Sequence, residues 1–138
     1  MLILAEFSSG FGRVSAMSLV AALGTRIIRL SPLIGLVIGV GYALGGLTFD
    51  ALFFVLPAMN LGGRSRKIYV LAASAISGSL AMVPYLFFRF SVLGPDAFLA
   101  LTPIYALSTV KGILFSVAGS SLALSILPRV RSMLNPLS

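Results

Sequence analysis

Long apolar runs alternate along the chain with short polar or basic connections. The first clear run covers residues 32–57, PLIGLVIGVGYALGGLTFDALFFVLP, and it is apolar around the whole helix rather than along one stripe. About 20 residues at roughly 1.5 Å rise each cross the ~30 Å hydrocarbon core of a bilayer, and this run exceeds that length. We therefore predict a transmembrane helix over residues 32–57, with Pro32 in its first turn.

Small residues of this span share one helix face. At about 100° per residue, the face carries Gly35, Gly39, Tyr42, Gly46 and Asp50. Such a stripe lets another helix backbone come close, and close packing drives helix association in lipid. An acid on this stripe is expected to point into protein or a wet cavity. Two interpretations stay open, a packing seam with a satisfied carboxylate or a ligand- or ion-facing site, and we assign these residues a structural or gating role.

Two further apolar runs predict spans over residues 68–88 and 98–127. Pro84 is expected to kink the former, and Pro128 is expected to end the latter. Each run again gathers small residues and a tyrosine on one face: Ser74, Gly78, Ala81 and Tyr85 in the former, and Tyr105, Ser108, Gly112, Ser116, Gly119 and Ala123 in the latter. Close packing explains both stripes, and a polar kink lined by Tyr85 is the alternative.

Residues 1–31 are less regular. One interpretation is a single helix over residues 2–23, and the other is a short surface helix or half-span, because the polar stretch 8–13 interrupts the apolar pattern. Residues 25–31, TRIIRLS, form a short basic connection. We expect one transmembrane domain over residues 1–138, with the all-α fold of an integral membrane bundle of about four helices.

The composition supports this class. The chain has 138 residues, of which 59 % are hydrophobic and only 9 % charged, whereas ordinary soluble domains are about 25 % charged. Its net charge of +7 comes mostly from arginines and lysines that flank the apolar runs, as expected for residues that set topology and touch anionic lipid headgroups. A basic patch with interleaved aromatic residues is missing, so no nucleic-acid partner is expected.

The basic residues also predict the orientation. Loop 58–67 and the C-terminal tail together hold Arg64, Arg66, Lys67, Arg129 and Arg131, and the opposite side holds Arg26, Arg29 and Arg89. Because cytoplasmic loops carry the excess of Lys and Arg, we place the loop and the C-terminus in the cytoplasm of a multi-pass cell (plasma) membrane protein.

The residues that most catalytic or metal sites need are scarce. There is no Cys and no His, and the carboxylates are Glu6, Asp50 and Asp96. We therefore expect no metal, no cofactor and no catalytic residue, and an enzyme acting alone is the least favoured function class. The chain also lacks a GxxxxGK[ST] loop, so any ATP-driven process needs ATPases in other chains. Small-residue stripes on a chain of this size favour a membrane partner subunit.

Lys111 lies within the last span, away from its small-residue face. Pairing with Asp50 is disfavoured, because the acid lies about 10 Å before Pro57 whereas the lysine lies about 25 Å before Pro128 on a parallel helix. We expect Lys111 to snorkel outward or to line a cavity near the other side of the membrane.

The pattern over residues 32–131 resembles the substrate-binding S components of energy-coupling factor vitamin transporters. The resemblance consists of GLVIGVGYALGGLTFDALFFVLPA, a basic loop, a Ser/Ala-rich span and a final helix that runs into PRVR. Members of this family are small membrane-helix bundles that hold a ligand near the extracellular side and dock onto a transmembrane partner with two ATPases. They usually have six helices and an Ala-x-x-x-Ala docking motif, to which Ser18-x-x-x-Ala22 is the nearest match here.

The resemblance implies a ligand near the outer ends of the spans. On that basis Tyr85 and Tyr105 are candidates for stacking or hydrogen bonding, and Lys111 for an anionic group, with Arg26 or Arg29 at the mouth. Each tyrosine could equally be an interfacial anchor. The leading hypothesis is a small-solute or vitamin uptake component that binds substrate and works with energising partners. The competing hypothesis is a structural or accessory subunit of a larger membrane complex.

Overall fold

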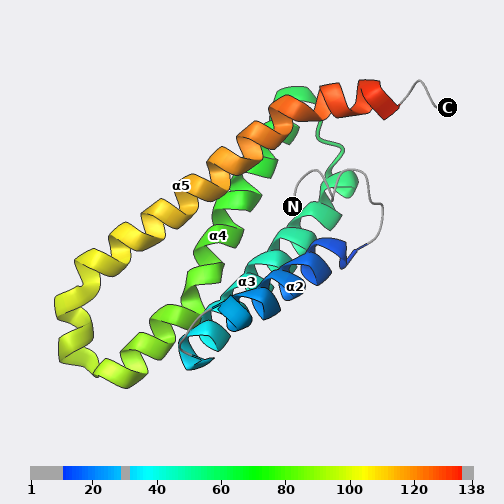
Figure 1. Cartoon of the computed structure of the whole chain (residues 1–138). Helices are drawn as coiled ribbons and strands as arrows, with labels where there is room; N and C mark the ends of the chain where they lie inside the picture. Colours follow the sequence, from blue (N-terminus) through cyan, green and yellow to red (C-terminus); the bar gives the residue numbers. More distant parts are fainter. Residues whose placement is uncertain (1–10, 29–31, 135–138) are drawn as a thin grey trace.

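The computed structural model describes residues 11–28 and 32–134, and these residues form an all-α helix bundle (Figure 1). In chain order its elements are α2 (Arg13–Ile28), α3 (Pro32–Val55), the 3₁₀ turn η1 (Leu56–Met59), α4 (Gly63–Leu93) and α5 (Pro95–Leu134). Helices long and apolar enough to cross a membrane cover Leu33–Met59, Gly63–Leu93 and Pro95–Val130. The predicted class, an integral membrane helix bundle, fits this architecture.

The long helices extend beyond the predicted spans. α4 already begins at Gly63, so Arg64 and Arg66 lie in its first turns rather than in a loop. α5 continues through Pro128 to Leu134, so the prediction that this proline ends the helix is wrong. Hydropathy marks only the part of a helix that suits hydrocarbon, whereas backbone hydrogen bonding continues where polar side chains reach the interface.

The N-terminal part of the described chain is a short helix. α2 begins at Arg13, after a turn in which Gly12 has a φ of +94°. A left-handed residue cannot continue an α-helix, so a helix cannot run unbroken through Gly12, as the interpretation of a single helix over residues 2–23 requires. The 16 residues of α2 extend about 24 Å, less than the hydrocarbon core needs. The short-helix alternative is therefore the one observed, and residues 1–10 lie outside the described part.

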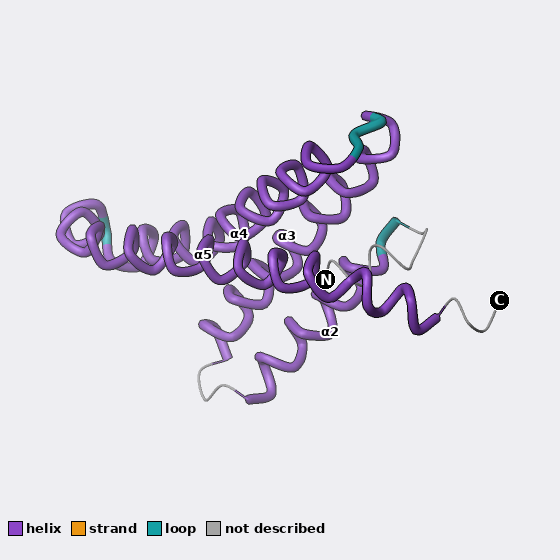
Figure 2. The backbone as a smooth tube through the Cα atoms, turned by 90° about the horizontal axis from the view of Figure 1, so that it is seen from above, coloured by secondary structure: helices purple, strands orange, loops and turns teal. Residues whose placement is uncertain are grey.

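The helices pack in sequence order, α2 on α3, α3 on α4 and α4 on α5. All four meet near η1, where Val14, Phe49, Leu56 and Val70 form a buried cluster that Ala123 and Leu124 of α5 also touch. Figures 1 and 2 show α5 leaning away from α2 and α3 toward the turn that joins it to α4. In Figure 1, α4 changes direction in its C-terminal part, which contains Pro84. This bend agrees with the kink predicted at Pro84.

Glycines bring α3 close to helices on two sides. A Cβ at Gly39 would lie 3.3 Å from the Ala22 carbonyl oxygen of α2, and one at Gly46 would collide with Ser18. The predicted glycine face is therefore a packing seam against α2, and the Ser18/Ala22 face is covered inside the chain. A second seam, which was not predicted, faces α4, where a Cβ at Gly45 would lie 3.1 Å from the Ala81 Cβ.

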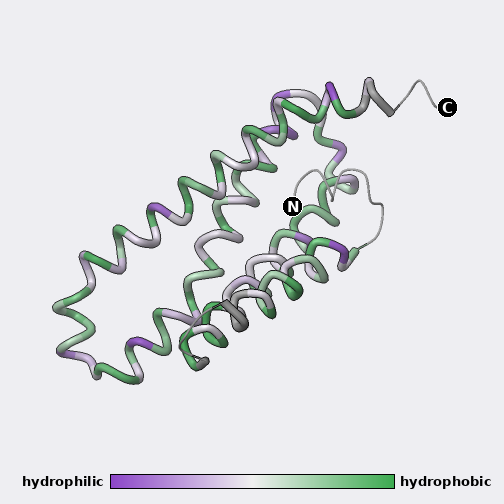
Figure 3. The backbone as a smooth tube through the Cα atoms, viewed as in Figure 1, coloured by the Kyte–Doolittle hydropathy of each residue, from purple (hydrophilic) through white to green (hydrophobic). Residues whose placement is uncertain are grey.

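Apolar side chains cover the outside of the bundle. Figure 3 shows hydrophobic positions along α3, α4 and α5, with most strongly hydrophilic ones near the helix ends. Large side chains are widely exposed, for example Phe87 at 71 % and Phe115 at 78 %. A soluble monomer rarely exposes so much apolar surface, whereas hydrocarbon or a partner helix covers it without cost.

Candidate functional site

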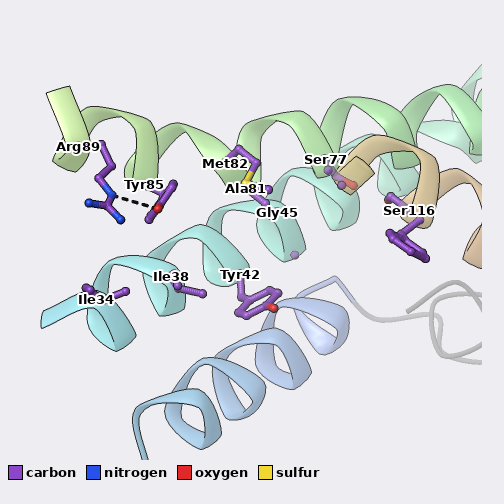
Figure 4. A pocket seen from close by; sticks show the side chains of 14 residues that line it. Ile34, Ile38, Tyr42, Gly45, Ser77, Ala81, Met82, Tyr85, Arg89 and Ser116 are labelled. Carbon is purple, nitrogen blue, oxygen red and sulfur yellow. Dashed lines mark hydrogen bonds between the residues drawn. The ribbon is translucent and has the colours of Figure 1, made fainter. Parts of the chain in front are cut away.

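A cleft of about 710 Å³ lies between α3, α4 and α5 (Figure 4). It is lined from α3 by Ile34, Ile38, Tyr42, Gly45 and Gly46, from α4 by Ser77, Gly78, Ala81, Met82, Tyr85 and Arg89, and from α5 by Gly112, Phe115 and Ser116. Most of these side chains are apolar, and the polar ones gather toward two ends, except Tyr42, which lies between them. We call these the arginine end, at Tyr85 and Arg89, and the serine end, at Ser77 and Ser116.

At the arginine end, one side chain orients another. The Arg89 Nε donates a hydrogen bond of 3.0 Å to the Tyr85 hydroxyl, and its guanidinium carbon lies 5.4 Å from the centre of the Tyr85 ring. The two residues are four apart on α4 and so share a helix face. The dashed line in Figure 4 marks this bond. Hydrogen bond and cation–π contact together fix a positive group beside an otherwise apolar cleft.

Aromatic rings of α5 pack against Tyr85 on the side away from the cleft. Tyr85 meets Tyr105 of α5 edge to face, with ring centres 6.4 Å apart, and Tyr105 stacks on Phe98 at 5.2 Å. Tyr105 is buried and does not line the cleft. It therefore stands behind Tyr85 as a positioning residue, and of the two predicted ligand tyrosines only Tyr85 reaches the cleft.

At the serine end, hydroxyl groups join α4 to α5. Ser77 and Ser116 donate to the same acceptor, the Ser74 carbonyl oxygen, over 3.0 and 2.8 Å. The buried Ser74 hydroxyl bonds to the Ser120 hydroxyl over 2.5 Å and donates to the Val70 carbonyl. Because their protons are used in this way, Ser77 and Ser116 offer the cleft oxygen lone pairs and no donor.

Asp50 lies outside the cleft, in the seam between α2 and α3. It is 6 % exposed, and its Oδ2 accepts the Ser15 backbone N–H at 2.8 Å and the Ser15 hydroxyl at 2.6 Å. The first N–H groups of a helix lack partners within that helix, and a carboxylate there also complements the helix dipole. Of the two interpretations left open for Asp50, the satisfied carboxylate in a packing seam is the one observed.

The other predicted site residues lie in different parts of the structure. Tyr42 is 44 % exposed and lines the cleft, whereas Gly35 is buried. Lys111 is exposed near the middle of the Pro95–Val130 span and does not line the cleft, so its snorkelling stays a prediction. Arg26 belongs to the last turn of α2, and Arg29 lies outside the described residues.

Sequence reasoning used Arg89 only to set topology and so missed it as a site residue. A usable signal was present, because Tyr85 and Arg89 stand four residues apart near the end of a span, the spacing at which helix side chains meet. No family model, curated protein or solved structure matches this chain. The resemblance to S components of energy-coupling factor transporters therefore stays a prediction.

Proposed function

We propose that the chain is a small-solute uptake component that binds its substrate in the cleft between α3, α4 and α5. The observation that carries this proposal is a cleft of about 710 Å³ with apolar walls, an oriented arginine at one end and hydroxyl oxygens at the other. Ligand sites are typically clefts of roughly 300–1,000 Å³, mostly apolar with a few placed polar groups.

The expected topology gives the cleft a direction. With loop 58–67 in the cytoplasm, the arginine end belongs to the outer half of the membrane, because Arg89 lies near the opposite end of α4. A solute arriving from outside then meets Arg89 first. Movement across the membrane requires energising partners, since the chain has no phosphate-binding loop of its own.

Native mass spectrometry after gentle detergent purification tests this function. We expect a stoichiometric small molecule that is not a lipid, released from the wild type and lost in Arg89→Gln. Arg64→Gln is the matched control, because it removes an exposed positive charge from the other end of the same helix. Finding only lipid in every sample, with the chain fixed in a larger assembly, would contradict an uptake component.

One observation favours a second function, an accessory subunit that packs against a larger complex. In an apolar 18-residue stretch of the Pro95–Val130 span only 6 % of the residues are buried, against 33 % in the corresponding stretch of the Leu33–Met59 span. Leu107, Leu114 and Leu122 are each more than half exposed on this helix. Photo-crosslinkers at these positions, combined with the mass spectrometry, distinguish the two functions: one defined protein partner without any co-released solute supports the accessory role, whereas a co-released solute supports the uptake proposal whether or not a partner is crosslinked.

A further inference from the structure

We infer that the cleft takes an elongated organic anion with an apolar body and a hydrogen-bond donor at the end remote from its charge. This inference rests on the proposed function and names its substrate class. The carboxylate or phosphate would lie at Arg89, and the donor at Ser77 and Ser116. Four observations carry the assignment: a cation without an ion pair among the described residues, a largely apolar middle, the separation of the two polar ends, and the direction of the serine hydroxyl groups.

Arg89 carries a positive charge that no carboxylate within residues 11–28 and 32–134 neutralises. Of the carboxylates in the described residues, Asp50 is bonded to Ser15 in the α2–α3 seam and Asp96 is exposed in the first turn of α5. Neither forms an ion pair with Arg89, whose recorded polar partner is the Tyr85 hydroxyl, bound through Nε. A guanidinium has five N–H donors in a fork that matches carboxylate or phosphate, so four remain for a ligand.

The middle of the cleft suits an apolar body. Between the polar ends lie Ile38 and Tyr42 of α3 and Ala81 and Met82 of α4 (Figure 4), so this part is apolar apart from the Tyr42 hydroxyl. An unbranched methionine adapts to irregular ligand shapes, and an aromatic ring offers a flat contact surface. A small inorganic anion would leave these walls uncovered. The anionic group therefore belongs to a larger molecule.

The distance between the ends requires an elongated shape. Arg89 and Ser77 are twelve residues apart on α4, which corresponds to about 18 Å along the helix axis. The arginine side chain covers part of that length, and the ligand covers the rest. Figure 4 shows the Arg89–Tyr85 pair and the two serines at opposite ends of the site.

The serine end selects a donor. Ser77 gives its proton to the Ser74 carbonyl within α4, and Ser116 gives its proton to the same carbonyl from α5, so while these hydrogen bonds are kept both hydroxyl oxygens can only accept from a ligand. A hydroxyl or N–H on the ligand fits these oxygens, whereas a second acceptor would face unpaired lone pairs. The polarity thus runs from an anion at Arg89 to a donor at the serines.

The same anionic chemistry has two possible sources, a solute from water or an anionic lipid from the bilayer. A lipid would place its headgroup at Arg89 and an apolar chain end at the serines, where the hydroxyl oxygens would find no donor. A solute with a remote donor satisfies both ends. The structure therefore favours the solute, and the experiment separates the two sources.

Calorimetric titration in phosphatidylcholine nanodiscs tests the substrate class with three probes of one length, after subtraction of heats from empty nanodiscs. 10-Hydroxydecanoate carries the anion and the remote donor, decanoate only the anion, and 1,10-decanediol no charge. We expect 10-hydroxydecanoate to bind at least tenfold more tightly than the diol. Arg89→Gln should bring its affinity down to that of the diol, with binding of the diol retained as a sign of an intact cleft, and Arg64→Gln should change nothing.

The serine end has its own test. Replacing both Ser77 and Ser116 by Ala should make 10-hydroxydecanoate and decanoate bind alike, while the wild type prefers the hydroxy acid severalfold. Equal affinity of the wild type for the hydroxy acid and the diol overturns the anion assignment, yet leaves an uptake component for neutral solutes. Binding of no probe, together with a co-purified solute that bears no anionic group, overturns it as well.

The lipid source is examined in nanodiscs that contain phosphatidylglycerol. If native mass spectrometry finds one phosphatidylglycerol retained by the wild type and by Arg64→Gln but not by Arg89→Gln, while none of the three probes binds, the anion assignment stands and the solute proposal fails. Retention that does not depend on Arg89 counts against the assignment. The substrate class and the proposed function can therefore fail separately.

Discussion

Asp50 of α3 caps the first turn of α2 through Ser15. A single carboxylate oxygen accepts the backbone N–H and the side-chain hydroxyl of that serine. Next to this contact, Ser18 fits against Gly46 and donates to the Ser15 carbonyl over 2.8 Å. These contacts hold the N-terminal end of α2, which is too short to span the membrane, against α3. Each of the polar groups involved would be costly if it were left unpaired in an apolar surrounding.

Replacing Asp50 should loosen α2. Hydrogen bonds to charged groups contribute about 1.5–3 kcal/mol each, and a buried N–H left without a partner adds to the loss, so we expect Asp50→Ala to lower the free energy of unfolding by about 2 kcal/mol or more. Asp50→Asn keeps one acceptor oxygen and should lose less. Reversible unfolding in mixed micelles measures the change. Asp96→Asn, at an exposed acid in the first turn of α5, is the control and should shift stability by less than about 1 kcal/mol.

The seam between α3 and α4 predicts a sharp contrast between two glycines. A Cβ at Gly41 would collide with the Ala81 backbone carbonyl, whereas a Cβ at Gly119 would meet nothing within 4 Å. Forcing extra volume into a packed contact costs about 1–3 kcal/mol, so Gly41→Ala should destabilise the bundle by that amount. Gly119→Ala should be neutral or stabilising by roughly 0.5–1 kcal/mol, because alanine favours a helix. Equal effects in the same unfolding assay would mean that α3 and α4 do not meet here.

Periodicity predicted part of this packing. Gly39, Gly46 and Asp50 follow the 3.6-residue repeat, and the structure places all three in one seam. Gly41 and Gly45 lie on another side of the same helix, and a pattern in one helix cannot tell which neighbour needs a close approach there. A seam is visible from sequence, but its partner helix is set by the tertiary arrangement.

The candidate site was harder to predict for the same reason. Tyr85 could be singled out from its place after a proline near the end of a span, but its support by Tyr105 depends on where α5 crosses α4. Lys111 was the obvious cation because it interrupts an apolar run, yet it is exposed on α5 and does not line the cleft. Arg89 looked like an ordinary flanking residue, and only the fold shows that its guanidinium turns back over Tyr85.

The serine contact between α4 and α5 should show measurable coupling. Interhelical hydrogen bonds in membranes average about 0.6 kcal/mol in double-mutant cycles, so a cycle of Ser74→Ala and Ser120→Ala should give a coupling energy near that value. A cycle of Ser74→Ala and Ser108→Ala serves as control, because the Ser108 hydroxyl donates to Ile104 of its own helix. Coupling below about 0.2 kcal/mol in the first cycle would remove the hydrogen bond as a link between these helices.

Tyr85→Phe separates the two roles of Tyr85. The substitution keeps the ring under the guanidinium and its edge contact with Tyr105, but removes the hydroxyl that accepts from Arg89 Nε. Arg89 then loses its fixed direction, and an unpaired N–H remains. Because a hydrogen bond of this kind contributes about 1–2 kcal/mol, we expect the affinity for 10-hydroxydecanoate to fall roughly tenfold, with the affinity for 1,10-decanediol unchanged.

The matched control for this substitution is Tyr69→Phe. Tyr69 donates its hydroxyl to the Leu52 carbonyl over 2.8 Å, far along α4 from the cleft. Tyr69→Phe removes one hydrogen bond, as Tyr85→Phe does, so it should lower the free energy of unfolding by a similar amount. It should leave the affinities for all three probes unchanged. If Tyr85→Phe lowers the affinities for 10-hydroxydecanoate and 1,10-decanediol equally, the Tyr85 hydroxyl maintains the shape of the cleft rather than the orientation of Arg89. If only the affinity for 10-hydroxydecanoate falls, Tyr85 acts by orienting the positive charge of Arg89.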